Sequence, residues 1–442
     1  MADPKKKTSV QAEIIFFVLI VAILFVFCYH YAFADETQTN EITGNQNTIN
    51  FGWWGNDERH DYTLQGIDIF EQKNPSINVN CTYSVWSGYE RRNRIYMRSG
   101  SEPDVMQINY NWISEYSPDG NGYYNLYDLS DYIDLSSYTE NELSYGTVNG
   151  KLNALPIAYN SVVFFYNQDL LDQYGLDVPK TWDDLFAAAE KLNGTDEKVL
   201  YMNIKHVFLT LIAHYEQTTG KEVFDENGNY VGGDDAIRDM LTFYDKMIRA
   251  GVINTEQKMD GNDFMAQKTL GAGFWASDAD RYCEPLSDAG VTVTLADPPA
   301  VSVSGEESST AATTGWYVKP ATMYAISVDT QYPDDSAKLL DFLVNDPQMA
   351  LLQGTEKGIP VSRKAQAVLE DNNAMEGYGA TAGTYVLDNL GSLPLMIPAM
   401  ENTDIIDAFS DVSAQYIYGK CTIDEGISTL ESDWEDILGG GE

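Results

Sequence analysis

Tryptophans stand at the ends of several apolar, strand-like runs in this chain. Five of its eight tryptophans have this position, namely Trp53, Trp54, Trp86, Trp112 and Trp275. In an open α/β sheet, the carboxyl ends of the strands border the ligand crevice. Indole rings at those ends would form a stacking platform, and the apolar faces of pyranose rings suit such a platform. Any one tryptophan can simply fill a core, but the repetition favours sugar recognition.

Polar side chains near these tryptophans could bind sugar hydroxyls. Asn56 and Arg59 follow the first tryptophan pair, and Asn109 and Asn111 flank Tyr110. An amide both donates and accepts hydrogen bonds, as a hydroxyl does, and a guanidinium donates bonds that its charge strengthens. Asparagines at a strand end are equally typical of turns, so both interpretations stay open.

The predicted ligand-binding set combines the aromatic platform and these polar groups with residues of a crossing segment and of a second unit. Its members are Trp53, Trp54, Asn56, Arg59, Trp86, Tyr89, Asn109, Asn111, Trp112, Tyr159, Asn160, Trp275 and Trp316. In the loop after Trp54, a helix cap by Asp57 or Asp61 is the competing role. No catalytic residue, metal ligand or cofactor is predicted.

Four arginines share one predicted helix in an otherwise acidic protein. They are Arg91, Arg92, Arg94 and Arg98. Such a group is usually a solvated face that pairs with nearby carboxylates. The alternative is a local positive site for a uronic-acid or sialylated glycan. A steep salt dependence confined to acidic ligands would favour that alternative.

Motifs for catalysis and for metal binding are missing from the sequence. It has no nucleophile elbow and no phosphate loop, and its four histidines lack the spacing of metal ligands. A glycoside hydrolase or another carbohydrate-active surface enzyme is the alternative function. Glycoside hydrolysis needs two paired carboxylates, and 67 Asp and Glu residues provide many chance pairs. A ferric-ion binder that uses adjacent tyrosines such as Tyr123 and Tyr124 is disfavoured by the tryptophans.

Charge and cysteine content exclude further classes of protein. The formal net charge is −40 over 442 residues, with 27 Lys and Arg against 67 Asp and Glu. Such a surface repels nucleic acid and favours solubility, so nucleic-acid binding is excluded as the main role. The four cysteines, Cys28, Cys81, Cys283 and Cys421, match neither a zinc site nor a redox pair.

The first 34 residues predict export across a membrane. An almost unbroken apolar run at 14–27 follows Lys5, Lys6 and Lys7, which is the layout of a secretory signal. Cleavage before Asp35 is one expectation, retention of residues 1–34 as a membrane anchor is another, and lipidation of Cys28 is a third. Residues 35–47 are expected to form a flexible tether. Each version puts the folded part outside the cytoplasmic membrane.

Alternating strand and helix patterns predict an α/β fold. Strands are expected at 48–54, 77–85 and 104–109, with helices between them. That order is the signature of a doubly wound, parallel sheet. A second unit has expected strands at 159–166, 269–275 and 291–295, with a helix capped by Thr181 and Asp184. The C-terminal third is expected to be helical.

Several short motifs occur in a characteristic order along the chain. They are Phe70-Glu71 with Asn74-Pro75, residues 100–105, Asn149-Gly150-Lys151 before Leu155-Pro156, residues 166–171, residues 179–185, Ile397-Pro398 and residues 419–427. In this order they resemble the family 1 extracellular solute-binding proteins of bacterial ABC importers. The similarity covers nearly all of the chain after the tether, and the combined order is specific although each motif alone is weak.

The resemblance implies a two-lobed fold, each lobe an open, mostly parallel sheet flanked by helices, with an oligosaccharide bound in the cleft between the lobes. Lobe 1 is expected to comprise residues 48–158 with 300–345, and lobe 2 residues 159–299 with 346–442. It also implies a monomer of the maltose-binding-protein-like type that closes on the sugar and docks a membrane permease. Asp404 stands where maltose binders have a ring-stacking tryptophan, so the second lobe would need another stacking surface, such as Trp275.

Overall fold

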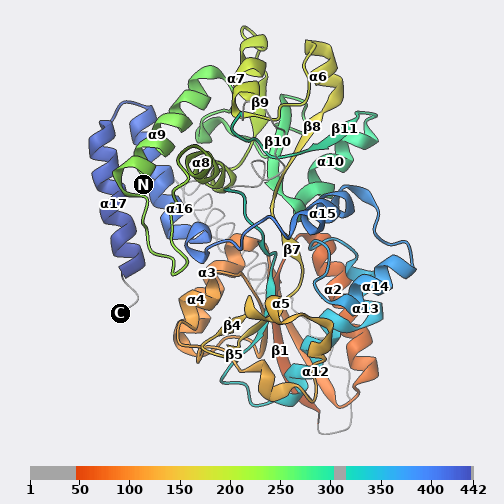
Figure 1. Ribbon diagram of the computed structural model, residues 1–442. Helices are drawn as coiled ribbons and strands as arrows, with labels where there is room; N and C mark the ends of the chain where they lie inside the picture. Colours follow the sequence, from red (N-terminus) through yellow and green to blue (C-terminus); the bar gives the residue numbers. More distant parts are fainter. Residues whose placement is uncertain (1–45, 303–314, 440–442) are drawn as a thin grey trace, which may run out of the picture. The chain divides into compact units, whose positions relative to one another are not determined.

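Two open β-sheets with helices on their faces form the protein (Figure 1). The computed structural model describes residues 46–302 and 315–439. The first sheet has the order β2-β1-β3-β13-β6, with β1 (Asn47–Trp54), β2 (Ile77–Ser84), β3 (Val105–Ile108), β6 (Ala154–Pro156) and β13 (Met323–Ile326). The second has the order β11-β8-β10-β9, with β8 (Val162–Asn167), β9 (Lys198–Tyr201), β10 (Thr269–Trp275) and β11 (Val293–Ala296). Two short pairs are β7 (Tyr159–Asn160) with β12 (Lys319–Pro320), and β4 (Thr147–Val148) with β5 (Lys151–Leu152).

Helices connect the strands and fill the C-terminal third. Before β13 they are α2 (Asp57–Lys73), α3 (Trp86–Ser99), α4 (Trp112–Tyr116), α5 (Glu140–Ser144), α6 (Gln168–Tyr174), α7 (Trp182–Lys191), α8 (Ile204–Thr219), α9 (Gly233–Ala250) and α10 (Ala279–Asp288). After β13 they are α12 (Pro333–Asn345), α13 (Pro347–Gln353), α14 (Arg363–Asp371), α15 (Gly377–Asn389), α16 (Thr403–Ile417) and α17 (Ile423–Gly439). Single 3₁₀ turns are η1 (Leu126–Leu129), η2 (Leu135–Ser137), η3 (Glu256–Lys258), η4 (Ala276–Asp278) and η5 (Pro398–Glu401). The predicted helical C-terminal third is confirmed.

The sequence pattern explains the edge of the first sheet. β1 pairs in parallel with β2 from Asn47↔Ile77 to Trp54↔Ser84, and β2 is the outer strand. An outer strand has one face near solvent, which suits the alternation of apolar and polar residues along β2. β3 lies further inside and is buried at all four positions. The predicted positions of these strands along the chain are confirmed.

One strand in each sheet runs against the direction of the others. β13 runs antiparallel to both β3 and β6, and β8 runs antiparallel to both β10 and β11. Each of these strands directly follows one strand of the crossing pair, β7 or β12. Both therefore enter their sheets without the helical crossover that makes neighbouring strands parallel. The α/β class is confirmed, and so is the prediction of mostly parallel sheets, since four of the five strands of the first sheet and three of the four strands of the second run in one direction.

Helix boundaries follow local sequence signals. α2 begins after Asn56, whose side-chain oxygen accepts the backbone N–H of Arg59 at 2.9 Å, and it ends just before Asn74-Pro75. The cap is therefore Asn56 rather than either of the aspartates that follow it. α7 begins with the predicted capping box, in which Thr181 and Asp184 bond reciprocally.

Helices from the last quarter of the chain pack on the first sheet's helices. α12 and α13 contact α2, and α14 contacts α12 and α13. In Figure 1 the blue α13 and α14 lie beside the red α2. The lobe boundary at residue 346 stays a prediction, and these contacts associate α13 with the helix that follows the first strand.

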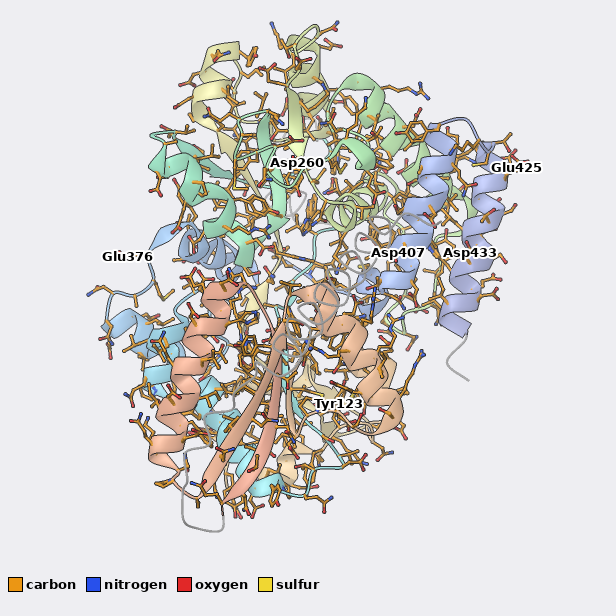
Figure 2. All side chains as sticks on the ribbon, turned by 180° about the vertical axis from the view of Figure 1, so that it is seen from behind. Tyr123, Asp260, Glu376, Asp407, Glu425 and Asp433 are labelled. Atoms are coloured by element: carbon orange, nitrogen blue, oxygen red, sulfur yellow. The ribbon has the colours of Figure 1, made fainter. Side chains whose placement is uncertain are left out.

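The last two helices form an acidic, well-packed pair. α16 and α17 contact each other and α9. Trp434 of α17 is fully buried, and its Nε1 donates to the backbone oxygen of Ile405 at 3.1 Å. Figure 2 shows the acidic side chains Asp407, Glu425 and Asp433 on these helices. The contacts of Trp434 show that α17 packs against the rest of the protein through its apolar side.

Predictions for the N-terminal segment lie outside the described residues. These are the signal or anchor at 1–34, the possible lipidation of Cys28 and nearly all of the tether at 35–47. Within residues 46–302 and 315–439, no helix is long and apolar enough to cross a bilayer.

Candidate ligand-binding site

Three of the predicted tryptophans meet in one group of rings. Trp54, Trp86 and Trp112, together with Tyr89, form what we call the aromatic cluster. The ring centroids of Trp86 and Trp112 lie 5.6 Å apart with nearly parallel planes, and Trp54 lies 4.9 Å from Trp86 and 5.8 Å from Trp112. Trp54 and Trp112 are buried, whereas Trp86 is only half-buried. Trp86 is therefore the member with the most ring surface open to solvent.

Strand order brings these rings together. Trp54 ends β1, Trp86 begins α3 after β2, and Trp112 begins α4 after β3. β1 lies between β2 and β3 in the sheet, so the carboxyl ends of three parallel strands meet at one edge. The hydroxyl of Tyr89 donates to the backbone oxygens of Gly52 at 3.0 Å and of residue 107 at 2.8 Å. Those bonds fasten α3 to the sheet and fix the positions of the rings.

Trp53 lies on the opposite side of β1, because successive strand residues face opposite ways. It has no exposed surface and is stacked between Phe51 at 4.8 Å and Tyr83 at 4.7 Å, centroid to centroid. Its Nε1 donates to Nδ1 of His60 at 3.1 Å. Its role in ligand binding stays a prediction, but both of its ring faces are covered by other side chains.

The predicted asparagines already have partners in the protein. Nδ2 of Asn109 donates to Oδ1 of Asn111 at 2.6 Å, and the N–H of Trp112 donates to the backbone oxygen of Asn109 at 3.1 Å. These bonds build the turn between β3 and α4, and Asn56 caps α2. Turn and cap chemistry is thus present at all three asparagines, while their contact with a ligand stays a prediction.

Arg59 and Asn160 connect the first sheet to the second. Nη2 of Arg59, on α2, donates to the backbone oxygens of Ser277 at 3.1 Å and of Glu356 at 2.6 Å. Nδ2 of Asn160, in the crossing strand β7, donates to the hydroxyl of Ser277 at 3.0 Å. Ser277 follows β10 of the second sheet, so both side chains lie where the two sheets' segments meet.

Two predicted residues lie away from the aromatic cluster. The hydroxyl of Tyr159 donates to the carboxylate of Glu142, which also pairs with Arg363 at 2.8 Å. Trp316 is buried, and its Nε1 donates to the backbone oxygen of Pro299 at 3.2 Å. Both side chains have their polar atoms satisfied inside the protein, and a ligand contact by either stays a prediction.

A group of charged residues that sequence reasoning missed lies next to Trp86 and Trp275. Lys319 Nζ donates to both carboxylate oxygens of Glu401 at 2.7 Å, and Lys205 Nζ lies 3.6 Å from the same carboxylate. Lys319 lies 4.6 Å from the ring centroid of Trp275, and Lys205 lies 6.0 Å from that of Trp86. We call Lys205, Lys319 and Glu401 the lysine–glutamate group. It joins the predicted tryptophan of the second sheet to the aromatic cluster.

Burial and neighbouring charges set the ionisation of this region. Burial alone would raise the pKa of Glu401, but Lys319 and Lys205 together hold it below its usual value. The pKa of His206 is lowered to about 3, mainly by burial and further by the positive charges of the same two lysines. Burial also raises the pKa of Asp278 against the opposing effects of nearby cations. At neutral pH the lysine–glutamate group therefore holds an ionised glutamate beside a neutral histidine.

The arginines of α3 show the pairing typical of a surface helix. Arg94 lies 4.0 Å from Glu90 and 3.8 Å from Asp404, and Arg92 donates to the hydroxyl of Ser84 at 2.6 Å. Arg91 and Arg98 are exposed. These contacts fit a solvated face with nearby carboxylates.

Comparison with known families decides the class of the protein. The family described as bacterial extracellular solute-binding protein matches residues 65–377, which is more than half of the chain. The chain belongs to this family. The predicted family and the two-lobed α/β fold are confirmed.

Sequence similarity to other binding proteins covers part of the chain. The maltooligosaccharide ABC transporter solute-binding lipoprotein of Streptococcus pneumoniae is 25% identical over 292 residues, which is 62% of this chain and 64% of that protein. A putative binding protein of Brucella abortus is 26% identical over 168 residues, 36% of this chain and 39% of that protein. The chain thus matches less than two thirds of the length of these relatives.

The likeness to a solved structure covers more of the chain than the likeness to these relatives does. The periplasmic oligogalacturonide-binding protein of Yersinia enterocolitica, solved with saturated digalacturonic acid, has a TM-score of 0.80 and 27% sequence identity. That likeness covers 90% of this solute-binding protein and all of the Yersinia chain. The shared fold therefore extends over both sheets.

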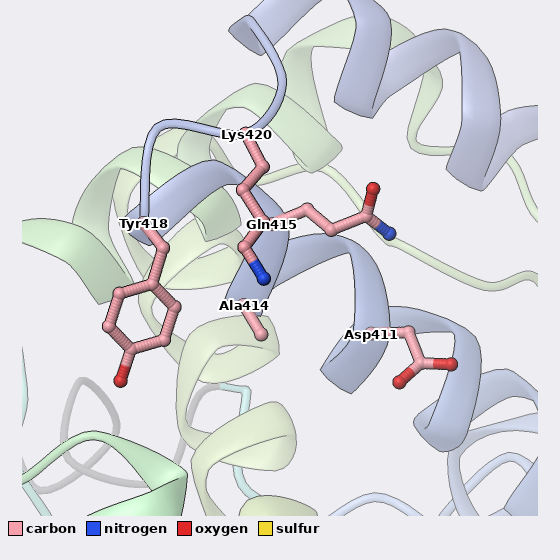
Figure 3. A pocket seen from close by; sticks show the side chains of 5 residues that line it. All are labelled: Asp411, Ala414, Gln415, Tyr418 and Lys420. Carbon is pink, nitrogen blue, oxygen red and sulfur yellow. The ribbon is translucent and has the colours of Figure 1, made fainter.

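Two cavities among the described residues lie away from the aromatic cluster. One, of about 690 Å³, is lined by Asp411, Ala414, Gln415, Tyr418 and Lys420 at the end of α16 (Figure 3). The other, of about 360 Å³, lies around the end of α8 and residues 394–397. Neither is lined by a residue of the predicted ligand-binding set. Nor does the described part of the chain hold a group of three or more His, Cys, Asp or Glu side chains that could bind a metal.

Proposed function

We propose that this solute-binding protein captures an oligosaccharide at the aromatic cluster and delivers it to the permease of an ABC importer. The observation that carries the proposal is the meeting of Trp54, Trp86 and Trp112 at the carboxyl edge of the first sheet. Tryptophan faces stack on sugar rings, and pockets for small ligands occur at this edge of α/β sheets. The sugar-binding names of relatives support the same ligand class.

Trp86 is the residue that we propose contacts the sugar first. It is half-buried, with Trp112 stacked behind it and Lys205 over its ring. A pyranose that replaces the lysine on this face would keep the indole covered and would lie beside the second sheet's Trp275. The proposed site residues are therefore Trp54, Trp86, Trp112 and Trp275, with Arg59 and Asn160 at the junction of the two sheets' segments.

Trp86→Ala is expected to weaken binding of the oligosaccharide at least about tenfold, or about 1.4 kcal/mol, because it removes the most accessible ring. Its unfolding free energy should change little, since the side chain is only half-buried. Titration calorimetry against a panel of oligosaccharides measures the affinity, with Trp182→Phe, a core change in the second lobe, as the control. Normal binding by the Trp86 variant would place the site elsewhere.

Mass spectrometry of the released ligand tests the hydrolase alternative, since a binding protein returns the sugar unchanged.

We propose that two lobes close on the ligand. Arg59→Gln is expected to increase the radius of gyration of the ligand-free protein, because it removes the bonds from α2 to Ser277 and Glu356. Sugar should reduce the radius of the unaltered protein in small-angle scattering. Arg98→Gln, an exposed change on α3, serves as the control. A radius that sugar and substitution both leave unchanged would eliminate the closure mechanism.

The protein is proposed to act as a monomer on the outer face of the cytoplasmic membrane. The word lipoprotein in the name of the Streptococcus relative supports a tether to the membrane. The predicted signal, anchor or lipidated cysteine at the N-terminus would supply that tether.

A further inference from the structure

Lys205 stands out as a cation placed to bind an anion beside the aromatic cluster. Its Nζ lies 3.6 Å from Glu401 and 6.0 Å from the ring centroid of Trp86, and its side chain is 24% exposed. We propose that the ligand is an acidic oligosaccharide, and that Lys205 binds the carboxylate of a uronic-acid unit whose ring stacks on Trp86. This inference rests on the proposed function, and it adds the chemical class of the sugar and the residue that selects it.

The lysine–glutamate group holds more positive than negative charge. One carboxylate, that of Glu401, serves two lysines, and both of its oxygens bond to Lys319 at 2.7 Å. Lys319 and Glu401 are almost fully buried, so this pair satisfies itself. Lys205 keeps only the longer contact and is partly exposed. In a protein with a net charge of −40, this ammonium group could exchange its contact with Glu401 for one with the carboxylate of a ligand.

Other groups around Lys205 favour an anion as well. Lys205 lies in the first turn of α8, a helix of 16 residues, where the backbone dipole favours negative charge. His206 is buried beside it, and Nε2 of that ring has no hydrogen-bond partner among the described residues. The carboxylate of Asp278 would repel an anion. Its negative charge is offset by the nearby cations Arg59, Arg281 and Lys319. Two lysines thus share one glutamate, and Lys205 itself stands at a helix N-terminus, next in sequence to a buried imidazole with an unpaired nitrogen.

The position of Lys205 selects between neutral and acidic sugars. The ammonium group lies over the ring of Trp86, 6.0 Å from its centroid, and is paired with Glu401 at 3.6 Å. A uronate that stacks on Trp86 would exchange the Lys205–Glu401 contact for a contact between Lys205 and its own carboxylate, while Lys319 keeps Glu401 paired. A neutral sugar displaces the same ammonium group from the ring without offering it a charge. The acidic sugar thus gains an ion pair that the neutral sugar lacks.

The arginines of α3 do not supply this selectivity. Arg94 is shared between Glu90 and Asp404, and Arg92 is bonded to Ser84. The proposed anion site therefore lies on α8 rather than on α3, at a single lysine near the aromatic cluster.

Calorimetry with matched ligands tests the inference. The probes are oligogalacturonides, oligoglucuronides and oligomannuronates, each with its carboxyl-reduced counterpart, in which a primary alcohol replaces every carboxylate. The unaltered protein should bind one oligouronide at least about tenfold more tightly than its reduced form. Lys205→Gln should remove that preference, Lys205→Arg should retain it, and Lys205→Glu should reverse it. Lys221→Gln is the control, because Lys221 is an exposed lysine just beyond the other end of α8.

Each outcome bears on one proposal. Equal affinity for acidic and reduced sugars, both lost in Trp86→Ala, would overturn the acidic-sugar inference and leave the proposed function intact. If Lys205→Gln still preferred the acidic sugar over its reduced form, the inference would also be overturned, because another cation would then bind the carboxylate. Binding of no oligosaccharide of either kind, or of those in the wider panel, would overturn the proposed function itself.

Discussion

Trp53→Ala is expected to lower the free energy of unfolding by about 3–5 kcal/mol, the usual cost of removing a fully buried tryptophan. Trp53 has no exposed surface, stacks on Phe51 and Tyr83, and donates from Nε1 to His60. The substitution would leave a cavity between β1 and α2, and His60 would lose its partner. Denaturant unfolding measures the loss, and the affinity for sugar of the fraction that stays folded should change less than twofold.

Two further substitutions separate the core from the site. Trp53→Phe keeps most of the ring volume and should cost roughly 1–2 kcal/mol, since it removes the indole N–H and part of the stack. Trp86→Ala should lose affinity for sugar and little stability, whereas Trp53→Ala should lose stability and little affinity. If Trp53→Ala left stability unchanged and weakened sugar binding, Trp53 would belong to the site and the packing around it would have another explanation.

Local sequence signals predicted much of the fold. The polar–apolar alternation from Ile77 onward is typical of an edge strand, as β2 is, and the Asn74-Pro75 pair stands where α2 ends. The capping box at Thr181 is a bond between residues three apart, so the sequence alone carries it. Strand direction is different, because it depends on which end of the sheet a strand enters. β13 and β8 follow the crossing pair, and nothing within either strand encodes that connection.

The meeting of aromatic rings at one edge of the first sheet was predicted in outline. Trp54, Trp86 and Trp112 meet because each stands at or shortly after the end of a strand, and parallel strands end at one edge. Adjacent tryptophans in one strand face opposite ways, so only one of Trp53 and Trp54 could join the cluster. The sequence does not show which of the two does so, since that depends on which face of β1 is covered by α2.

The lysine–glutamate group could not be predicted from the sequence. Lys319 lies in the crossing strand β12 and Glu401 in the turn η5, 82 residues later, and no short-range spacing connects them. Lys205 lies on a third element, α8. Each residue is unremarkable among 27 basic and 67 acidic residues. Only the folded arrangement shows that two of the lysines share one buried carboxylate.

Glu401→Met is expected to be the most destabilising change in the lysine–glutamate group, at about 3–5 kcal/mol, because it leaves Lys319 buried without a partner and close to Lys205. Lys319→Met should cost less, since Lys205 still reaches the carboxylate of Glu401 at 3.6 Å. Denaturant unfolding of both variants and of the Lys319→Met/Glu401→Met double variant measures this order.

The double variant separates a structural role of the pair from a role in binding. Replacing both members of a buried pair by apolar side chains of similar size is often neutral or stabilising, so the double variant should recover most of the stability that Glu401→Met loses. It should also bind acidic sugar at least as tightly as the unaltered protein, because Lys205 no longer has Glu401 as a competing partner. A double variant that is as unstable as Glu401→Met would show that the loss comes from packing around residue 401 rather than from an unpaired lysine. A stable double variant that has lost affinity for acidic sugar would show that Lys319, rather than Lys205, holds the carboxylate of the ligand.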